Sequence, residues 1–117
     1  MNIQKYILVK ANNNISVESV AGDIIRLHDL QKSVGGWIEY VPIQNTCIKD
    51  LIFIVNEEGH MQNLPVNSIA SRFYLSTPSQ ASELTGDVVI AKVEKGNTIG
   101  LTEKELRLVL SSLRVLS

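Results

Sequence analysis

Residues 49–56, KDLIFIVN, contain the most informative pattern for the fold. Its centre, LIFIV, is an unbroken run of apolar, strand-forming residues, whereas a strand with one wet face alternates apolar and polar side chains. The run therefore predicts a strand that is buried on both faces. We expect this strand to form the core of a sheet.

The residues just before this strand predict a helix and an edge strand. WIEYVPI, residues 37–43, alternates with the period of a strand, and Pro42 indicates that this strand lies at an edge or ends there. Between residues 23 and 34, apolar side chains recur three or four positions apart, which predicts an amphipathic helix. We expect Asp23 to cap its start and the glycines at 35–36 to end it.

The N-terminal segments predict a β-hairpin. QKYILVK, residues 4–10, is rich in strand formers, and ISVESV, residues 15–20, alternates apolar and polar side chains. The asparagines at 12–14 tolerate the left-handed conformations of a turn. The chain is therefore expected to reverse between two paired strands.

The sequence IVNEEGHMQNLPVNSIAS, residues 54–71, leads from the central strand to a second helix. NEEG predicts a tight turn, and HMQNL, residues 60–64, predicts a short returning strand. We expect either Asn67 or Ser68 to cap a short helix that ends near Tyr74. The polar, serine-rich residues that follow, 76–84, predict a surface loop.

The C-terminal third predicts one more strand and the last helix. GDVVIAKVE, residues 86–94, indicates a strand that a turn in KGNTIG closes. Thr102 and Glu105 have the spacing of a capping box, and the apolar residues after them mark one helical face. The chain is therefore expected to form a single α+β domain over residues 1–117. It combines a mostly antiparallel sheet with one central amphipathic helix, one short helix and a C-terminal helix.

The composition narrows the range of functions. The 117 residues carry a formal net charge of -1, so the chain lacks the broad positive field that general nucleic-acid binding requires. Cys47 is the only cysteine, which excludes an internal disulfide and fits a reducing compartment. The apolar run near the N-terminus is too short for a signal peptide or a membrane span. We expect a cytoplasmic protein with no membrane partner.

Groups for catalysis and metal binding are scarce. His28 and His60 are the only histidines, and with one cysteine they do not supply a four-coordinate zinc site. Cys47 has no flanking pattern for an oxyanion hole, so we expect a half-buried, small apolar residue. Glu57 and Glu58 are interpreted as a solvated turn. The protein is therefore expected not to be an enzyme and to use no metal or cofactor.

Aromatic and polar side chains are better suited to binding. The candidate ligand-binding residues are Trp37, Asn63, Asn67, Arg72, Arg107 and Arg114. We expect Trp37 in the core, and the alternative is a platform on which a planar ligand stacks. The amides and the cation at 63–72 suit a base edge or a phosphate, or else only a capped helix with a surface arginine. The two arginines of the last helix either meet an anionic ligand or belong to a solvated face.

Three segments carry a resemblance to a known family. VGGWIEYV at 34–41, the stretch 54–71 quoted above and LTGDVVIAK at 84–92 together resemble the domain-of-unknown-function family 3846, common in bacteriophages and mobile elements. The matching features are the glycine pair before an aromatic strand, the Asn-Glu-Glu-Gly turn, the Leu-Pro-x-Asn run and the Gly-Asp-Val strand start. They cover most of residues 22–92. The resemblance implies a location in the cytoplasm of a bacterial host cell.

Some phage proteins that resemble this family are sponges that hold a cyclic ADP-ribose signal away from the Thoeris defence system. The resemblance therefore implies, as the leading hypothesis, a non-enzymatic phage protein that sequesters a small nucleotide-derived immune signal. Assembly into a homo-oligomer is left open. The alternative is a protein-protein inhibitor or host-takeover factor, which binds a host or defence protein through an apolar helix patch or an unpaired sheet edge. An enzyme that cleaves the signal has the least support.

Overall fold

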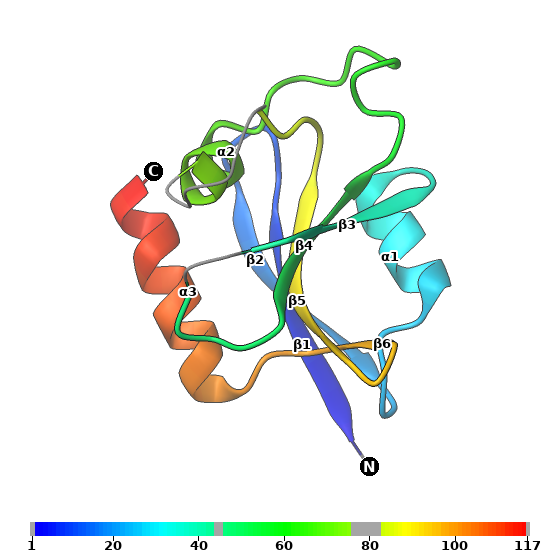
Figure 1. Ribbon diagram of the computed structural model, residues 1–117, viewed down its shortest axis with the longest axis vertical. Coiled ribbons are helices and arrows are strands. Elements are labelled where there is room, and N and C mark those ends of the chain that lie inside the picture. The colour runs from blue at the N-terminus through cyan, green and yellow to red at the C-terminus, as the bar shows by residue number, and fades with distance from the viewer. Residues whose placement is uncertain (1, 44–45, 76–82, 117) are drawn as a thin grey trace.

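The computed structural model describes residues 2–43, 46–75 and 83–116 (Figure 1). The strands are β1 (Ile3–Val9), β2 (Ile15–Ala21), β3 (Ile38–Pro42), β4 (Leu51–Asn56), β5 (Val88–Glu94) and β6 (Asn97–Ile99). The helices are α1 (Leu27–Val34), α2 (Ser68–Leu75) and α3 (Glu103–Leu116). The strands form one six-stranded sheet in the order β2-β1-β5-β4-β3, and β6 pairs with β5. All five strand pairings are antiparallel, which confirms the predicted α+β class.

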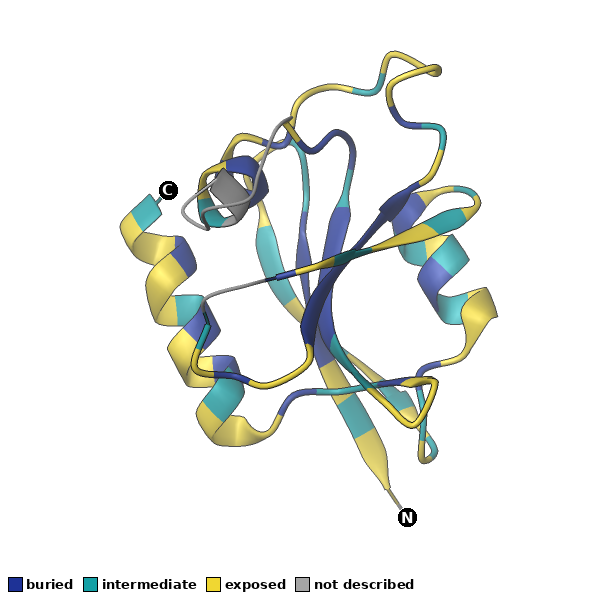
Figure 2. Cartoon of the chain, in the orientation of Figure 1, coloured by how far each residue is buried: buried dark blue, intermediate teal, exposed yellow. Residues whose placement is uncertain are grey.

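The central strand has the environment that its apolar run predicts. All six residues of β4 are buried, and β4 pairs with β3 on one side and β5 on the other. Leu51 and Phe53 pack in the cluster that includes α2 and α3, whereas Ile52 and Ile54 pack in the cluster that includes α1. The sheet therefore lies between helices on both faces, with its most buried strands in the middle (Figure 2).

The predicted N-terminal hairpin and edge strand are confirmed. β1 and β2 pair along their whole length, from Ile3 opposite Ala21 to Val9 opposite Ile15. β3 lies at one end of the sheet, where Pro42 is tolerated because its missing N–H faces away from β4. Because β3 has only one neighbouring strand, its residues are half-buried or exposed, whereas every residue of β4 is buried.

The first helix begins later than predicted. α1 starts at Leu27, its N-cap Arg26 makes no side-chain capping bond, and Asp23 instead accepts a hydrogen bond from the Asn2 side chain. Ile25 is 2% exposed, and its N–H donates to the Thr98 carbonyl at 2.8 Å. Because this contact with β6 holds the preceding segment away from helical geometry, the prediction of a helix from Asp23 was wrong.

Helix α1 ends at Val34, directly before the glycine pair, as the sequence predicts. Gly35 adopts a left-handed conformation with φ 79°, and its N–H donates to the Gln31 carbonyl at 2.8 Å. An added Cβ on Gly36 would lie 2.9 Å from Asn56 Nδ2, so this glycine lets β4 approach the helix end closely. Both glycines are therefore used, one for conformation and one for space.

The sequence patterns predict a short strand that is absent at residues 60–64, and they do not predict the short strand β6. Residues 60–64 form turns, because Leu64 N–H donates back to the Gly59 carbonyl and Asn63 takes a positive φ of 53°. The predicted returning strand there was wrong. The region 95–100 contains the strand β6, which follows a two-residue turn in which Lys95 and Gly96 both have positive φ. The expected loop 76–84 lies mostly outside the described residues.

The capping box of α3 is present in full. Thr102 N–H donates to Glu105 Oε1 at 2.8 Å, and Glu105 N–H donates to Thr102 Oγ1 at 3.2 Å. Lys92 Nζ also lies 2.8 Å from Glu105 Oε1 and ties the helix to β5. Burial raises the pKa of the Glu105 carboxyl, but Lys92 and the Thr102 hydrogen bonds outweigh burial and hold that pKa below its usual value.

We expect Glu105→Gln to lower the free energy of unfolding at pH 7 by about 1 kcal/mol. Because the folded-state pKa of Glu105 is depressed, its stabilisation is present above the unfolded pKa of about 4.3 and is lost as pH falls through the lower folded pKa. Urea unfolding of both proteins between pH 7 and pH 2 measures this. The curves of stability against pH should converge in acid; a gap that stays constant throughout contradicts the assignment.

Candidate functional site

The outer edge of β3 is unpaired among the described residues. On the inner edge, Glu57 N–H donates to the Trp37 carbonyl at 2.8 Å, and Ile43 N–H donates to the Leu51 carbonyl at 3.1 Å. Antiparallel pairing alternates, so the N–H and C=O groups of the residues in between, Ile38 and Tyr40, point away from β4. These groups form a short ladder that is open to a further strand.

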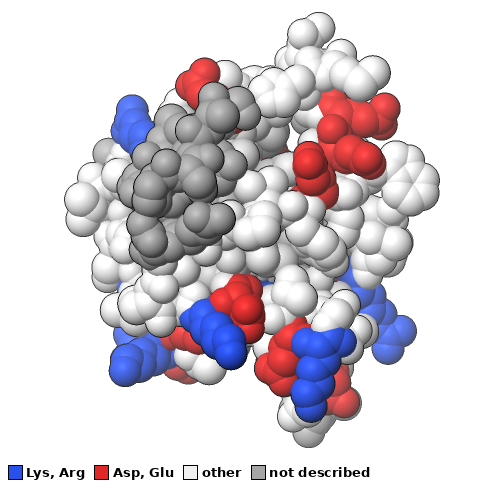
Figure 3. All heavy atoms as spheres, viewed as in Figure 1, with Lys and Arg blue, Asp and Glu red and all other residues white. Residues whose placement is uncertain are grey.

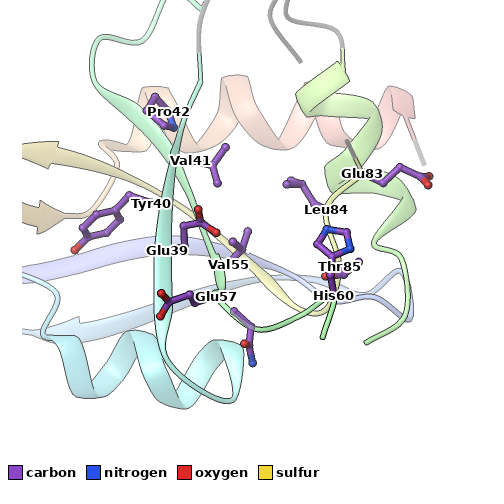
Figure 4. Close-up of a pocket in the computed structure, with 11 residues that line it drawn as sticks. Glu39, Tyr40, Val41, Pro42, Val55, Glu57, His60, Glu83, Leu84 and Thr85 are labelled. Atoms are coloured by element: carbon purple, nitrogen blue, oxygen red, sulfur yellow. The ribbon is translucent and has the colours of Figure 1, made fainter. Parts of the chain in front are cut away.

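A cleft lies beside this edge, on the sheet face that carries α2 and α3. Its volume is about 370 Å³, and it is lined by Glu39, Tyr40, Val41, Pro42, Val55, Asn56, Glu57, His60, Glu83, Leu84 and Thr85. β3 and the end of β4 form one wall, and Leu84, Thr85 and His60 form the other (Figure 4). Segments far apart in the sequence thus meet here.

One buried amide fixes the wall formed by β4. Asn56 is 5% exposed, and its Nδ2 donates to the Val34 carbonyl at 3.3 Å, which joins β4 to the end of α1. Its Oδ1 accepts a hydrogen bond from Glu58 N–H at 2.8 Å and shapes the turn that carries Glu57. The cleft wall is therefore held by the ordinary structure of the fold rather than by a mobile side chain.

The cleft is acidic. Glu39 and Glu57 both lie on the β3 side of the cleft, and Glu83 stands on the far side with its carboxylate turned outward (Figure 4). No Lys or Arg is among the residues that line the cleft within the described chain. Figure 3 shows a patch of acidic side chains on this side of the molecule, with the visible basic side chains elsewhere. Cations are therefore favoured here over anions.

A second, shallower depression lies where α1 meets β3. Its volume is about 340 Å³, and it is lined by His28, Gln31, Lys32, Gly36 and Trp37. Trp37 is 63% exposed, so the expectation that it belongs to the core was wrong. The indole lies just before β3, beyond the last turn of α1, and the adjacent residue Ile38 takes the place facing the core. Trp37 is thus available to a partner.

The other predicted binding residues are dispersed. Asn67 is 0% exposed and is fully engaged: its Nδ2 donates to the Val9 and Gly86 carbonyls, and its Oδ1 accepts from Ala70 N–H. Asn67, and not Ser68, therefore caps α2. Asn63 is exposed in a turn. None of the six predicted residues lines the acidic cleft, and only Trp37 lines the depression.

The three arginines among the predicted binding residues lie on the opposite side of the sheet from Trp37. Arg72, on α2, donates a hydrogen bond to the Leu116 carbonyl at the end of α3. Arg107 and Arg114 are exposed on α3, which packs against the sheet face opposite to α1. The sequence-based prediction therefore groups residues that the fold separates. It does not include Glu39 and Glu57, because no local sequence pattern indicates that they lie near residues 83–85.

The few catalytic candidates do not form a constellation within the described residues. His28 is exposed on α1, and His60 is exposed in the turn after β4. Cys47 is exposed in the connection between β3 and β4, which corrects the expectation of a half-buried residue. Across the described chain, no three His, Cys, Asp or Glu side chains converge to hold a metal ion.

The fold and the cleft define a small α+β protein with an open sheet edge beside an acidic cleft. A family model, Domain of unknown function (DUF3846), matches residues 3–113, and the chain belongs to this family. The match extends past the recognised segments to the N-terminal hairpin and most of α3. No curated protein and no solved structure matches the chain. None of the described helices is long and apolar enough to cross a bilayer.

Proposed function

We propose that the protein is a non-enzymatic binding protein that pairs with an extended segment of another protein along the outer edge of β3. The open backbone groups of Ile38 and Tyr40 carry this proposal. Added strands gain affinity from main-chain hydrogen bonds and specificity from side-chain pockets next to the edge. The acidic cleft is such a pocket. This function corresponds to an inhibitor or host-takeover factor directed at a host or defence protein.

The exposed aromatic residues beside the edge support the same proposal. Trp37 is 63% exposed and Tyr40 is 48% exposed, and tryptophan and tyrosine are enriched at protein interfaces. The Tyr40 hydroxyl lies 2.8 Å from Thr98 Oγ1, which holds the ring in one position before any partner arrives. A preorganised aromatic side chain reduces the entropy that association costs.

A matched pair of variants tests strand pairing. Tyr40→Pro removes the outward N–H and the side chain, whereas Tyr40→Ala removes only the side chain. A photo-crosslinking amino acid at Trp37, inside producing cells, should give one protein adduct. We expect Tyr40→Pro to reduce that adduct at least about tenfold relative to Tyr40→Ala, because a ladder bond is lost and the proline ring obstructs the edge.

The control for this experiment is the same crosslinker at Val115, which is 85% exposed on α3. It should give no matching adduct, because α3 lies on a different surface from β3. Unfolding curves of both Tyr40 variants show whether they are folded. Equal adducts from folded Tyr40→Pro and Tyr40→Ala proteins contradict strand pairing.

A second candidate function is sequestration of a nucleotide-derived immune signal of the cyclic ADP-ribose type. The depression beside Trp37 favours it, because an exposed indole offers a stacking surface and Lys32 offers a cation for phosphate. The acidic cleft disfavours an anionic ligand on the neighbouring surface, and the predicted arginines lie elsewhere. For these reasons we place protein binding first.

Trp37 itself reports on this second candidate, because it is the only tryptophan. Titration with ADP-ribose and cyclic nucleotides should quench its fluorescence if a base stacks on the indole. Lys32→Ala should then weaken the binding about tenfold or less, since Lys32 is exposed. Unchanged fluorescence up to high micromolar ligand contradicts sequestration at this site.

A further inference from the structure

The acidic cleft has a shape and chemistry that match one kind of side chain. Its carboxylates, Glu39 and Glu57, stand next to apolar surface from Val41, Val55 and Leu84. Lysine and arginine bury an aliphatic stem against apolar surface and keep the charged end near polar groups. A neutral side chain would leave the two carboxylates without a partner, and an acidic one would be repelled.

A buried hydroxyl at the same cleft has no hydrogen-bond partner among the described residues. Thr85 is 9% exposed and lines the cleft, and its side-chain hydroxyl makes no hydrogen bond with any described residue. Buried polar groups in folded proteins almost always have a partner, so a group without one needs an explanation. Thr85 Oγ1 lies against Gly59 at the side of the cleft. A donor that reaches this oxygen would supply a hydrogen bond, and both basic side chains carry only donors.

The edge of β3 places such a side chain within reach. Glu39 and Val41 point to the face of the sheet that carries the cleft, whereas Tyr40 points to the other face, where it contacts Thr98. A strand added to β3 would lie about 5 Å away, and every second side chain would project to the cleft face. One of these side chains would stand beside Glu39.

We propose that the cleft selects a lysine or arginine side chain in the extended partner segment that pairs with β3. The charge of the cleft then provides specificity, while the backbone ladder provides the sequence-independent part of the affinity. Glu39 on an otherwise open edge also discourages pairing with apolar or acidic strands. This inference rests on the proposed function and names the chemistry of the partner.

Selection from a displayed library of random eight-residue peptides on the immobilised protein tests the inference. The enriched peptides should alternate β-branched residues with polar ones and share a lysine or arginine at one aligned position. In the strongest binder, replacing that residue with norleucine, which keeps the stem and removes the charge, should weaken affinity about tenfold. Enriched peptides without a common basic residue overturn the inference.

Variants of the protein identify the cleft as the source of the selection. Glu39→Gln with Glu57→Gln should weaken the basic peptide about tenfold and leave the norleucine peptide within about twofold. Thr85→Val, which removes the hydroxyl at nearly equal volume, should weaken the basic peptide alone. Glu94→Gln, at an exposed position outside the cleft, is the matched control and should change neither. Equal losses for both peptides overturn the inference.

The outcomes separate this inference from the proposed function. If peptides are enriched and Tyr40→Pro abolishes their binding, but no basic residue is shared, strand pairing stands and the charge selection fails. If the library yields no binder, or if Tyr40→Pro leaves binding unchanged, both fail together. Unfolding curves for the Glu39 and Glu57 double variant show that a loss of binding is not a loss of fold.

Discussion

Asn67→Ala is expected to lower the free energy of unfolding by about 3–5 kcal/mol. The side chain of Asn67 is 0% exposed and makes three hydrogen bonds. Alanine would leave the carbonyls of Val9 and Gly86 and the N–H of Ala70 without these partners in a buried site. Small domains have about 5–15 kcal/mol of stability in total, so the loss is a large fraction. Urea unfolding measures it.

Ser68→Ala is the matched control, because Ser68 is the exposed neighbour that is the other cap candidate in the sequence. It should change stability by less than about 0.5 kcal/mol. Asn67→Asp retains the capping oxygen but removes both donors, and it should be about as damaging as alanine. A loss below about 1 kcal/mol for Asn67→Ala would show that water replaces the amide. Asn67 would then again be a candidate for ligand binding.

Phe53→Ala is expected to cost about 3–5 kcal/mol, as truncation of a large buried aromatic residue does. Phe53 is 0% exposed in the middle of β4 and contacts Phe73 edge-to-face, with ring centroids 5.8 Å apart and planes at 82°. Alanine would leave a cavity between the sheet and α2. The midpoint of urea unfolding should fall sharply, and the melting temperature should fall as well.

Phe53→Leu separates the cavity from the loss of the ring contact. Leucine fills most of the volume, so it should cost clearly less than alanine does. Val115→Ala, at a residue 85% exposed, should stay within about 0.5 kcal/mol of the unchanged protein. If Phe53→Ala cost no more than Val115→Ala, the position would not belong to a packed core.

Prediction from the sequence worked best where local patterning and burial agree. The apolar run of β4 and the capping box at Thr102 and Glu105 each describe an interaction within a few residues of sequence. Gly35 acts locally too, since a left-handed residue ends a helix wherever it stands. These elements needed no information about the rest of the chain.

Prediction failed where a distant segment supplies the deciding contact. The predicted cap at Asp23 does not form, because the Ile25 N–H binds the backbone of β6, more than seventy residues away in sequence. The expected burial of Trp37 followed from the small number of large residues, but only the tertiary fold shows that Ile38 occupies the inward position. A weak local preference loses to a buried contact that satisfies both side chain and backbone.

The candidate site shows the same division. The alternation around Pro42 predicted an edge strand, and the edge is there. Nothing local predicted that Glu39 and Glu57 would face Leu84 and Thr85 across a cleft, or that Arg72 would lie on the other side of the sheet from Trp37. Spacing along the chain groups residues that share an element, whereas a binding surface groups residues from several elements.

Local sequence patterns are enough to predict the α+β class, the buried central strand, the N-terminal hairpin and the ends of the helices that have local caps. Long-range packing sets which strand edge stays open, which side chains line the cleft and which polar residues are buried in the interior. The difference lies in the sequence separation of the interacting residues. Periodicity, capping and turn formation depend on neighbours a few residues apart, whereas edge exposure, charge clustering and the burial of Asn67 depend on the order in which distant strands pair.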